Sequence, residues 1–251
     1  MTAQSRLASS DDGPAAATLT VGVLALQGGF AEHLNLLRTA ADLVKTSTPL
    51  SFEALEVRTP AELARCDGLI IPGGESTTIS FVAAQSGLLE PLRDFVKTQK
   101  KPTWGTCAGL ILLSEQANAT KKGGQELIGG LGVRVHRNHF GRQIESFEAR
   151  LDLPFLAAAD AFAPPPPFPG VFIRAPVVEE VLPGAPVTVL ATLPGRVDKM
   201  KAGVSRASTK DASGDVIAVR QGNVLGTSFH PELTPDARIH VWWLREILRL
   251  R

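Results

Sequence analysis

The sequence predicts an α/β protein, with a three-layer, mostly parallel sheet flanked by helices and an antiparallel or mixed extension. Three observations lead to this prediction. A strand pattern, a glycine-containing turn and a helical pattern follow one another repeatedly in the first half of the chain. From Gly130 onward the pattern changes to short strands separated by turns, and the chain ends on an amphipathic helical pattern. Repeated strand–turn–helix units build parallel sheets that are covered by helices on both faces.

The first unit begins with the apolar, β-branched run at 19–26, which suits a strand buried on both faces. The turn QGGF follows it, and the helical pattern EHLNLLRTAADLV has Leu34, Leu37 and Leu43 at helical spacing. The second unit is GLIIPGGE followed by STTISFVAAQSGLL, and the third is PTWGTCAGLILLSEQA. These units predict adjacent parallel strands.

The second half of the chain predicts short strands in GLGVRVHRN, QIESFEARLDL, GVFIRAP, VTVLATLP, VIAVRQGN and VLGTSFHP. The segment TPDARIHVWWLREILRLR predicts a final amphipathic helix, which Thr234 or Asp236 is expected to cap. The stretch 157–170 is rich in alanine and proline and predicts an extended polyproline II surface loop. The polar stretch 201–215 predicts a flexible loop.

The 251 residues are 44% hydrophobic and 20% charged, so they can bury a sizeable core. We expect a single domain over 18–251, preceded by a disordered extension over 1–17. The net charge of +1 gives no electrostatic reason to expect nucleic acid or a membrane surface as a partner. The apolar runs are shorter than the ~20 residues that cross a bilayer. The two cysteines and an N-terminus without an apolar signal region favour a reducing compartment, and we expect a cytoplasmic protein.

The pentapeptide GTCAG, from Gly105 to Gly109, has the pattern of a nucleophile elbow, in which a nucleophile lies on a strained turn between a strand and a helix. Small flanking residues make this turn possible. Cys107 would then lie at a helix N-terminus, where the helix dipole and free N–H groups favour a thiolate. The N–H of Ala108 would point to a developing oxyanion. On the pentapeptide alone, a buried structural cysteine is an equal alternative.

A nucleophilic cysteine needs a base and a group that orients the base. Among the five histidines, His230 has an acidic neighbour at a useful spacing, in TSFHPE. Pro231 disfavours helix at His230, and in an extended chain His230 and Glu232 point to the same side. They can therefore face one site. The alternative is a surface histidine in a turn that follows a strand.

The other histidines suggest less. We expect His136 and His139 to be structural or ligand-contacting residues, because no further cluster of ligands supports a metal site. His33 lies beside an acidic residue on the first predicted helix and is interpreted as a surface residue. His240 is interpreted as a structural residue of the last helix. Cys66 precedes a predicted strand and is interpreted as a small buried apolar residue.

The segment PGGES, from Pro72 to Ser76, also follows a predicted buried strand and precedes a helix. Its two glycines allow the backbone to approach a ligand closely. Their N–H groups can complete an oxyanion hole, and Ser76 can cap the helix. An ordinary turn between a strand and a helix is the alternative. No nucleotide-binding glycine motif is found, and we expect neither a cofactor nor a metal.

Taken together, the cysteine elbow, PGGEST and the late HPE resemble the class I glutamine amidotransferases, which have a Cys-His-Glu triad. Further segments look like the glutaminase subunits of pyridoxal 5′-phosphate synthases. These segments run from about residue 20 to the C-terminus, in the family's order. They are ALQGGFAEH (25–33), GLIIPGGESTTI (68–79), GTCAGLILL (105–113), RNHFGRQIESFE (137–148), VFIRAP (171–176) and GTSFHPELT (226–234).

The resemblance implies that L-glutamine is hydrolysed to L-glutamate and ammonia, and that the ammonia passes to a partner synthase subunit, which makes pyridoxal 5′-phosphate. It implies that Cys107 is the nucleophile, His230 the general base and acid, and Glu232 the residue that orients His230. The implied glutamine contacts are Gly74, Glu75, Ser76, Arg137, Ile173 and Arg174. Positive charge on Arg137 and Arg174 suits an α-carboxylate.

The resemblance also implies an oxyanion hole formed by the N–H groups of Gly74 and Ala108. Glutaminases of this family are active only with their synthase, so we expect Gln27, Gly28 and Gly29 to move together with PGG when the partner docks. Two alternatives remain open on the sequence: another hydrolase with the same cysteine elbow, such as a γ-glutamyl peptidase, and a non-catalytic protein that only binds the synthase.

Overall fold

The computed structural model of the chain describes residues 18–118, 124–137, 146–157, 164–193 and 214–251. The extension predicted over 1–17 lies outside the described residues. So do 158–163 of the proline-rich stretch and 201–213 of the predicted polar loop.

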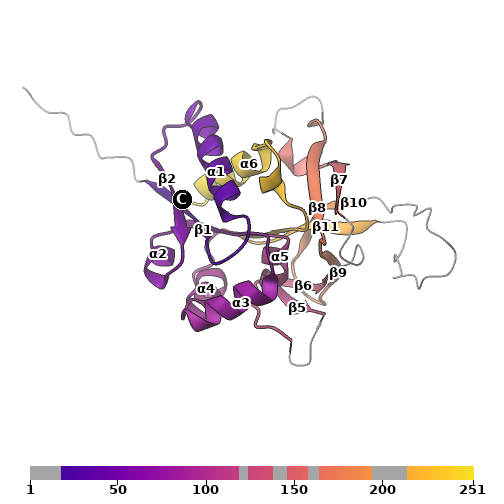
Figure 1. The fold of residues 1–251 in the computed structure, drawn as a ribbon. Coiled ribbons are helices and arrows are strands. Elements are labelled where there is room, and N and C mark those ends of the chain that lie inside the picture. The colour runs from indigo at the N-terminus through magenta and orange to yellow at the C-terminus, as the bar shows by residue number, and fades with distance from the viewer. Residues whose placement is uncertain (1–17, 119–123, 138–145, 158–163, 194–213) are drawn as a thin grey trace, which may run out of the picture.

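The described chain forms three layers, with a large sheet between two groups of helices (Figure 1). The strands of the ten-stranded sheet are β1 (Leu19–Leu24), β2 (Phe52–Val57), β3 (Gly68–Ile71), β4 (Thr103–Thr106), β5 (Ser114–Ala117), β6 (Leu131–His136), β9 (Val177–Val181), β10 (Thr188–Leu193), β11 (Asp215–Gln221) and β12 (Val224–Thr227). A separate antiparallel pair consists of β7 (Ser146–Leu151) and β8 (Phe168–Ile173).

The α-helices are α1 (Phe30–Lys45), α2 (Pro60–Ala64), α3 (Ser76–Gln85), α4 (Leu89–Arg93), α5 (Ala108–Leu113) and α6 (Arg238–Arg249). A π-helical turn, η1 (Asp94–Thr98), continues α4, and two 3₁₀ turns are η2 (Pro154–Leu156) and η3 (Pro231–Leu233). No helix among these is long and apolar enough to cross a membrane within the described part of the chain.

The sheet order is β2-β1-β3-β4-β12-β11-β9-β6-β5, and β10 pairs with β11. In this order the first five strands, β2, β1, β3, β4 and β12, are parallel to one another. Strand β11 pairs in antiparallel fashion with β12, β9 and β10, and β9 pairs in the same way with β6. This is the predicted fold class, and the change from parallel to mixed pairing follows the predicted change of pattern. Strands β2, β5 and β9 were not predicted. Strand β5 replaces the end of the third predicted helix, because α5 ends at Leu113.

Alternation along the strands places apolar side chains on both faces of the sheet. Val21 and Val23 of β1 face the layer of α1 and α6, whereas Leu69 and Ile71 of β3 face the layer of α3, α4 and α5. All four side chains are fully buried. Burial on both faces explains why these strands are continuous apolar runs.

Helix α1 buries two of the three predicted apolar positions. Leu34 and Leu37 are buried, but Leu43 is 50% exposed and Val44 is buried instead. The reason is helical geometry, because Val44 lies about two full turns after Leu37 and so returns to the same face. The prediction for Leu43 was therefore wrong by one position.

Two predicted helix caps are also wrong. Glu75, not Ser76, is the N-cap of α3, and its carboxylate accepts hydrogen bonds from the backbone and hydroxyl of Thr77. Helix α6 begins after Ala237, which has no side chain to cap it. Asp236 lies one residue earlier and accepts a hydrogen bond from the N–H of Arg238 at 3.0 Å.

The proline-rich stretch ends earlier than its predicted limit of residue 170. Residues 164–167 form neither helix nor strand, and β8 begins at Phe168. Phe168 is fully buried and its ring contacts that of Phe229, so burial of this ring favours the strand over an exposed loop. Arg238 donates hydrogen bonds to the carbonyls of Pro166 and Pro167, which anchors the end of the stretch to α6. At the other loop, Asp215 is already the first residue of β11.

Helix α5 approaches the sheet so closely that glycine is required on both sides. A Cβ atom on Gly105 would lie 2.4 Å from the backbone carbon of Gly109. A Cβ atom on Gly109 would lie 2.0 Å from the carbonyl oxygen of Ile71. Because these neighbours are backbone atoms, they cannot rotate away. The short contact holds the N-terminus of α5 against the ends of β3 and β4.

Substitution of Gly109 tests this contact. We expect Gly109→Ala to lower the free energy of unfolding by about 3 kcal/mol, because β3 or α5 must shift to admit the methyl group. Gly87→Ala is the matched control. Gly87 has φ +70° and open space around it, so only a backbone cost of about 1 kcal/mol is expected. Urea denaturation of both variants measures the difference, and equal losses would contradict the packing argument.

Candidate active site

The candidate site is built from four loops that follow neighbouring parallel strands. Strands β1, β3, β4 and β12 are adjacent in the sheet, so their carboxyl ends lie at one edge. The loops that leave this edge carry Gln27–Gly29, Pro72–Ser76, Cys107 and His230–Glu232 in the same order. Segments that are far apart in the sequence therefore meet at one place.

Cys107 lies on a strained turn between β4 and α5. Its backbone has φ +48° and ψ −101°, a region that non-glycine residues avoid. Its N–H donates to the carbonyl of Thr227 at 2.8 Å, which ties the turn to the end of β12. The side chain is only 6% exposed. The geometry is that of the predicted nucleophile elbow, in which surrounding backbone contacts maintain the strain.

His230 and Glu232 lie in the loop that follows β12. The Nδ1 atom of His230 lies 2.8 Å from Oε1 of Glu232. An extended chain was predicted here, but Pro231 instead starts the 3₁₀ turn η3. The two side chains meet nonetheless, because the turn folds Glu232 back toward the imidazole. Since a carboxylate only accepts hydrogen bonds, Nδ1 carries a proton and Nε2 is left for the reacting groups.

Cys107 and His230 meet above Gly73. A Cβ atom on Gly73 would lie 2.3 Å from Cε1 of His230 and 3.4 Å from Cβ of Cys107. Any larger residue at this position would therefore displace the imidazole. Nε2 of His230 is buried and makes no hydrogen bond to the rest of the described chain, so it is free to exchange a proton with the thiol and a substrate.

The charges of the site stabilise one another. Burial lowers the pKa of His230, but its interactions with Cys107 and Glu232 outweigh burial and raise the pKa to about 10. Burial also acts to raise the pKa of Glu232, yet His33 and His230 hold that pKa well below its usual range. Glu232 is therefore an ionised carboxylate at neutral pH, and it stabilises the imidazolium form of His230 beside Cys107.

His33 is part of this site, and its interpretation as a surface residue was wrong. It is fully buried in the first turn of α1, and its Nε2 lies 3.3 Å from Oε2 of Glu232. The same nitrogen lies 3.2 Å from Oγ1 of Thr106. The helical spacing from His33 to Leu37 and Val44 places all three on one face and would have predicted burial. The neighbouring acidic residue was a misleading signal.

His240 is buried in α6, as expected for a structural residue. Its Nε2 lies 3.0 Å from Nδ1 of His33, and the edge of Trp104 contacts both rings. Burial lowers the pKa of His240 well below its usual value, so this ring is neutral. Cys66 is buried as predicted, and burial raises the pKa of its thiol to about 11, which makes it unreactive at neutral pH.

Three of the predicted glutamine contacts form a second cluster. Ser76 Oγ accepts a hydrogen bond from Arg137 at 3.0 Å, and Oε1 of Glu75 lies 3.5 Å from the same guanidinium. The Ser76 hydroxyl donates to Oε1 of Gln125 at 3.1 Å, a partner that was not predicted. His139 and the rest of the motif after Arg137 lie outside the described residues.

Ile173 and Arg174 lie at the end of β8, beside the histidine loop. The N–H of His230 donates to the carbonyl of Val171 at 2.8 Å, which joins the two segments. Arg174 has φ +44°, so its backbone is strained. No hydrogen bond or ion pair joins its side chain to the other glutamine contacts among the described residues.

The loop Gln27–Gly29 interlocks with the PGG turn. The N–H of Gly29 donates to the carbonyl of Gly73 at 3.1 Å, and Oε1 of Gln27 accepts from the N–H of Glu75 at 2.8 Å. Gly28 has φ +98°, and a Cβ atom there would lie 1.8 Å from the Gly73 carbonyl oxygen. The two loops can therefore change conformation only together.

A sequence profile of the SNO glutamine amidotransferase family matches residues 23–249. The chain belongs to this family. The resemblance seen in the sequence motifs is therefore confirmed, and Gly105–Gly109 and His230–Glu232 both fall within the matched region.

Curated relatives of this SNO-family chain come from several kingdoms. It is 48% identical to "Pyridoxal 5′-phosphate synthase subunit PdxT" of Streptomyces avermitilis, over 89% of this chain and 91% of that one. It is 45% identical to "Probable pyridoxal 5′-phosphate synthase subunit PDX2" of Arabidopsis thaliana, over 90% and 85%. A solved structure described as a glutamine amidotransferase superimposes with a TM-score of 0.69 at 38% identity, over 90% and 98%.

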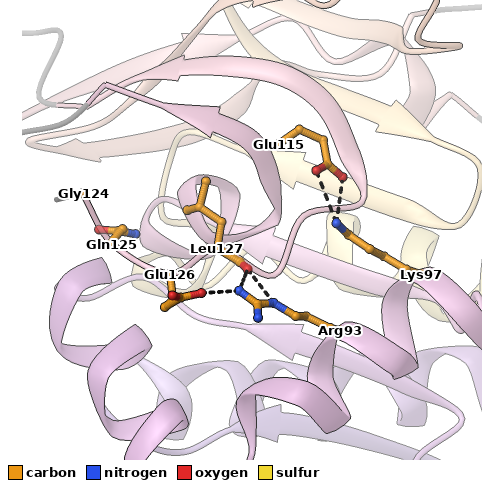
Figure 2. Close-up of a pocket in the computed structure, with 7 residues that line it drawn as sticks. All are labelled: Arg93, Lys97, Glu115, Gly124, Gln125, Glu126 and Leu127. Atoms are coloured by element: carbon orange, nitrogen blue, oxygen red, sulfur yellow. Dashed lines mark hydrogen bonds and ion pairs between the residues drawn. The ribbon is translucent and has the colours of Figure 1, made fainter.

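A polar hollow of about 510 Å³ in the SNO-family chain lies apart from the triad (Figure 2). Arg93 contacts Glu126 at 2.5 Å, and Lys97 contacts Glu115 at 3.1 Å. Because its cations are neutralised by acidic neighbours and no triad residue lines it, the hollow is not the candidate active site. Among the residues that the structure describes, no cluster of three or more His, Cys, Asp and Glu could hold a metal ion. The absence of a cofactor stays a prediction.

Removal of the Glu232 charge tests the electrostatics of the site. In Glu232→Gln the imidazolium of His230 loses its negative partner, so the pKa of His230 falls. We expect the midpoint of the His230 titration to fall by roughly one pH unit, which corresponds to about 1.4 kcal/mol. NMR titration of the His230 imidazole measures this shift. Glu115→Gln is the control, and an unchanged midpoint in Glu232→Gln would refute the coupling.

Proposed function

We propose that this chain is the glutaminase subunit of a pyridoxal 5′-phosphate synthase, which hydrolyses L-glutamine and passes ammonia to a partner synthase subunit. The observation that carries the proposal is the buried triad, in which Cys107 lies on a strained elbow beside His230 and Glu232 holds Nδ1 of His230 at 2.8 Å. Membership of a glutamine amidotransferase family supports the substrate. A cytoplasmic location suits the two free thiols.

In the first half of the reaction, the Cys107 thiolate attacks the side-chain amide carbon of glutamine. The negative charge that forms on the carbonyl oxygen is stabilised by the N–H groups of Gly74 and Ala108. His230 donates its Nε2 proton to the amide nitrogen, the C–N bond breaks, and ammonia leaves. A γ-glutamyl thioester remains on Cys107, and His230 is neutral.

In the second half, water attacks the thioester carbon, and His230 accepts a proton from the water at Nε2. The C–S bond breaks when the tetrahedral intermediate collapses, so glutamate leaves and the thiolate–imidazolium pair is restored. Glu232 stays ionised throughout and stabilises the imidazolium in both halves, which is the role of the acidic member of such triads.

We assign glutamine binding to Gly74, Glu75, Ser76, Arg137, Ile173 and Arg174. The geometry that supports this is the hydrogen bond from Arg137 to Ser76 at 3.0 Å, because it places beside the Gly74–Ser76 turn a guanidinium, the group that suits an α-carboxylate. Arg174 offers a second positive charge at the end of β8. The strained backbone at Arg174 is typical of residues that are held for ligand contact.

We further propose that docking of the synthase completes the oxyanion hole. The carbonyl of Gly73 and the N–H of Gly74 belong to one planar peptide unit. Because that carbonyl accepts from Gly29 at 3.1 Å, the orientation of the Gly74 N–H is tied to the Gln27–Gly29 loop. A partner that moves this loop therefore turns the donor that the oxyanion needs. Glycines at these positions make the change inexpensive.

The central test measures ammonia release from glutamine by the full chain, alone and with a matching synthase. We expect activity with the synthase, at least tenfold lower activity without it, and complete loss in Cys107→Ala because the thioester cannot form. Cys66→Ala is the matched control and should stay active. A folded chain that releases no ammonia with the synthase would overturn the proposed function, whereas full activity of the isolated chain would overturn only the docking step.

A second test concerns the carboxylate grip. Arg137→Gln removes a charged hydrogen bond worth about 1.5–3 kcal/mol, so we expect KM for glutamine to rise roughly ten- to hundredfold while kcat changes little. Arg134→Gln is the matched control, because Arg134 lies on β6, which ends one residue before Arg137, and pairs with Glu180 and Gln116 instead. Steady-state kinetics with the synthase distinguish the two. An unchanged KM in Arg137→Gln would exclude this residue from glutamine binding.

A further inference from the structure

The Glu232 carboxylate has two oxygens, and the triad uses only one of them. Oε1 lies 2.8 Å from Nδ1 of His230, while Oε2 faces Nε2 of His33 at 3.3 Å. Oε2 is buried and has no other hydrogen-bond partner among the residues that the structure describes. A buried carboxylate with one oxygen uncompensated is costly. The second oxygen therefore depends on His33.

We propose that His33 is a positioning residue of the glutaminase reaction, which holds Glu232 through its second oxygen, and that His240 fixes the tautomer of His33 that can do so. The inference rests on the proposed function, because it concerns the same triad. It adds two residues, His33 from α1 and His240 from α6, that lie on helices outside the loops of Cys107, His230 and Glu232.

The tautomer follows from the order of the contacts. His33 Nδ1 and His240 Nε2 lie 3.0 Å apart, so one of them donates and the other accepts. If His240 donates from Nε2, His33 accepts at Nδ1 and its proton is on Nε2, where it faces the carboxylate. In the opposite arrangement, a lone pair on His33 Nε2 would face the negative charge of Glu232. Electrostatics therefore selects His240 as the donor.

The far end of the chain of contacts favours the same arrangement. Nδ1 of His240 is buried and has no hydrogen-bond partner within the described residues. A buried N–H without an acceptor is rarer than a buried acceptor without a donor, so the proton of His240 belongs on Nε2. The ring of His240 is neutral, since burial holds its pKa low. The contacts of Glu232 and those of His240 thus favour the same tautomers, with His240 as the donor to His33.

The surroundings hold this chain in place. His33 and His240 are fully buried, and the edge of Trp104 packs against both rings. Oγ1 of Thr106 lies 3.2 Å from Nε2 of His33, and Thr106 directly precedes Cys107. The backbone N–H of His33 donates to the carbonyl of Gly29 at 3.4 Å. His33 thus contacts the cysteine strand, the glutamate and the end of the QGG loop.

The test uses the full chain with its synthase and compares His33→Leu with His33→Gln. Glutamine can donate an N–H to Oε2 of Glu232, whereas leucine cannot. We expect kcat to fall at least tenfold in His33→Leu with KM within about twofold, and to recover to within about threefold of wild type in His33→Gln. The thresholds correspond to the loss of one hydrogen bond to a charged group.

The pH profile supplies a readout that packing alone would not move. The titratable groups around Glu232 are His230, His33 and, behind it, His240, with Cys107 beyond His230. His33 lowers the pKa of Glu232, so its removal lets Glu232 bind a proton at higher pH. We expect the acid limb of the kcat/KM profile to move to higher pH in His33→Leu and to return in His33→Gln. Wild-type kcat and an unmoved acid limb in a folded His33→Leu variant would overturn the proposal.

A second pair of variants addresses the tautomer and also serves if His33→Leu does not fold. His240→Gln retains an N–H donor for His33, whereas His240→Phe has a similar size without the donor. We expect kcat near wild type in the first and at least tenfold lower in the second. Equal kcat values in the two would overturn the role of His240. The proposed function would still stand after that result if the wild-type protein releases ammonia and Cys107→Ala does not.

Discussion

The rest of the site depends on one buried carboxylate. Glu232 is only 5% exposed, and an ion taken out of water at this depth must be compensated on both oxygens. His230 on its own loop serves one oxygen, and His33 on α1 serves the other. The carboxylate therefore joins the first turn of α1 to the loop after β12, and its contact with Nδ1 leaves Nε2 of His230 for the reaction. Removing the charge would leave two histidines without the group that orients them.

Glycines allow the loops that carry the site residues to approach one another closely enough for these contacts. Gly73 leaves room for the imidazole, and Gly105 and Gly109 let α5 lie directly on the sheet. The same absence of side chains that permits these distances would cost stability in an isolated helix or strand. Here, adjacent strand ends supply the rigid base, so the strained turn at Cys107 is held by contacts on all sides.

Much of the fold and the triad could be predicted because their signals are local. Strand–turn–helix units, GTCAG and HPE each occupy a few consecutive residues, and each constrains its own backbone. Strands β2, β5 and β9 were missed because they are short or partly exposed and lack the apolar runs of the central strands. His33, His240 and Gln125 were missed as site residues for a different reason. Their roles come from long-range contacts, and only the buried stripe of α1 carried a usable signal for His33.

The segment from Gln27 to His33 contacts two parts of the catalytic site. Through Gly29 it contacts the peptide unit that presents the Gly74 N–H, and through His33 it contacts the glutamate that orients the base. Stabilisation of the oxyanion and alignment of the base thus both depend on one short stretch of chain. For inhibitor discovery, this stretch is a target outside the glutamine pocket. A compound that binds it and holds it in one conformation would inhibit both formation and hydrolysis of the thioester without competing with glutamine.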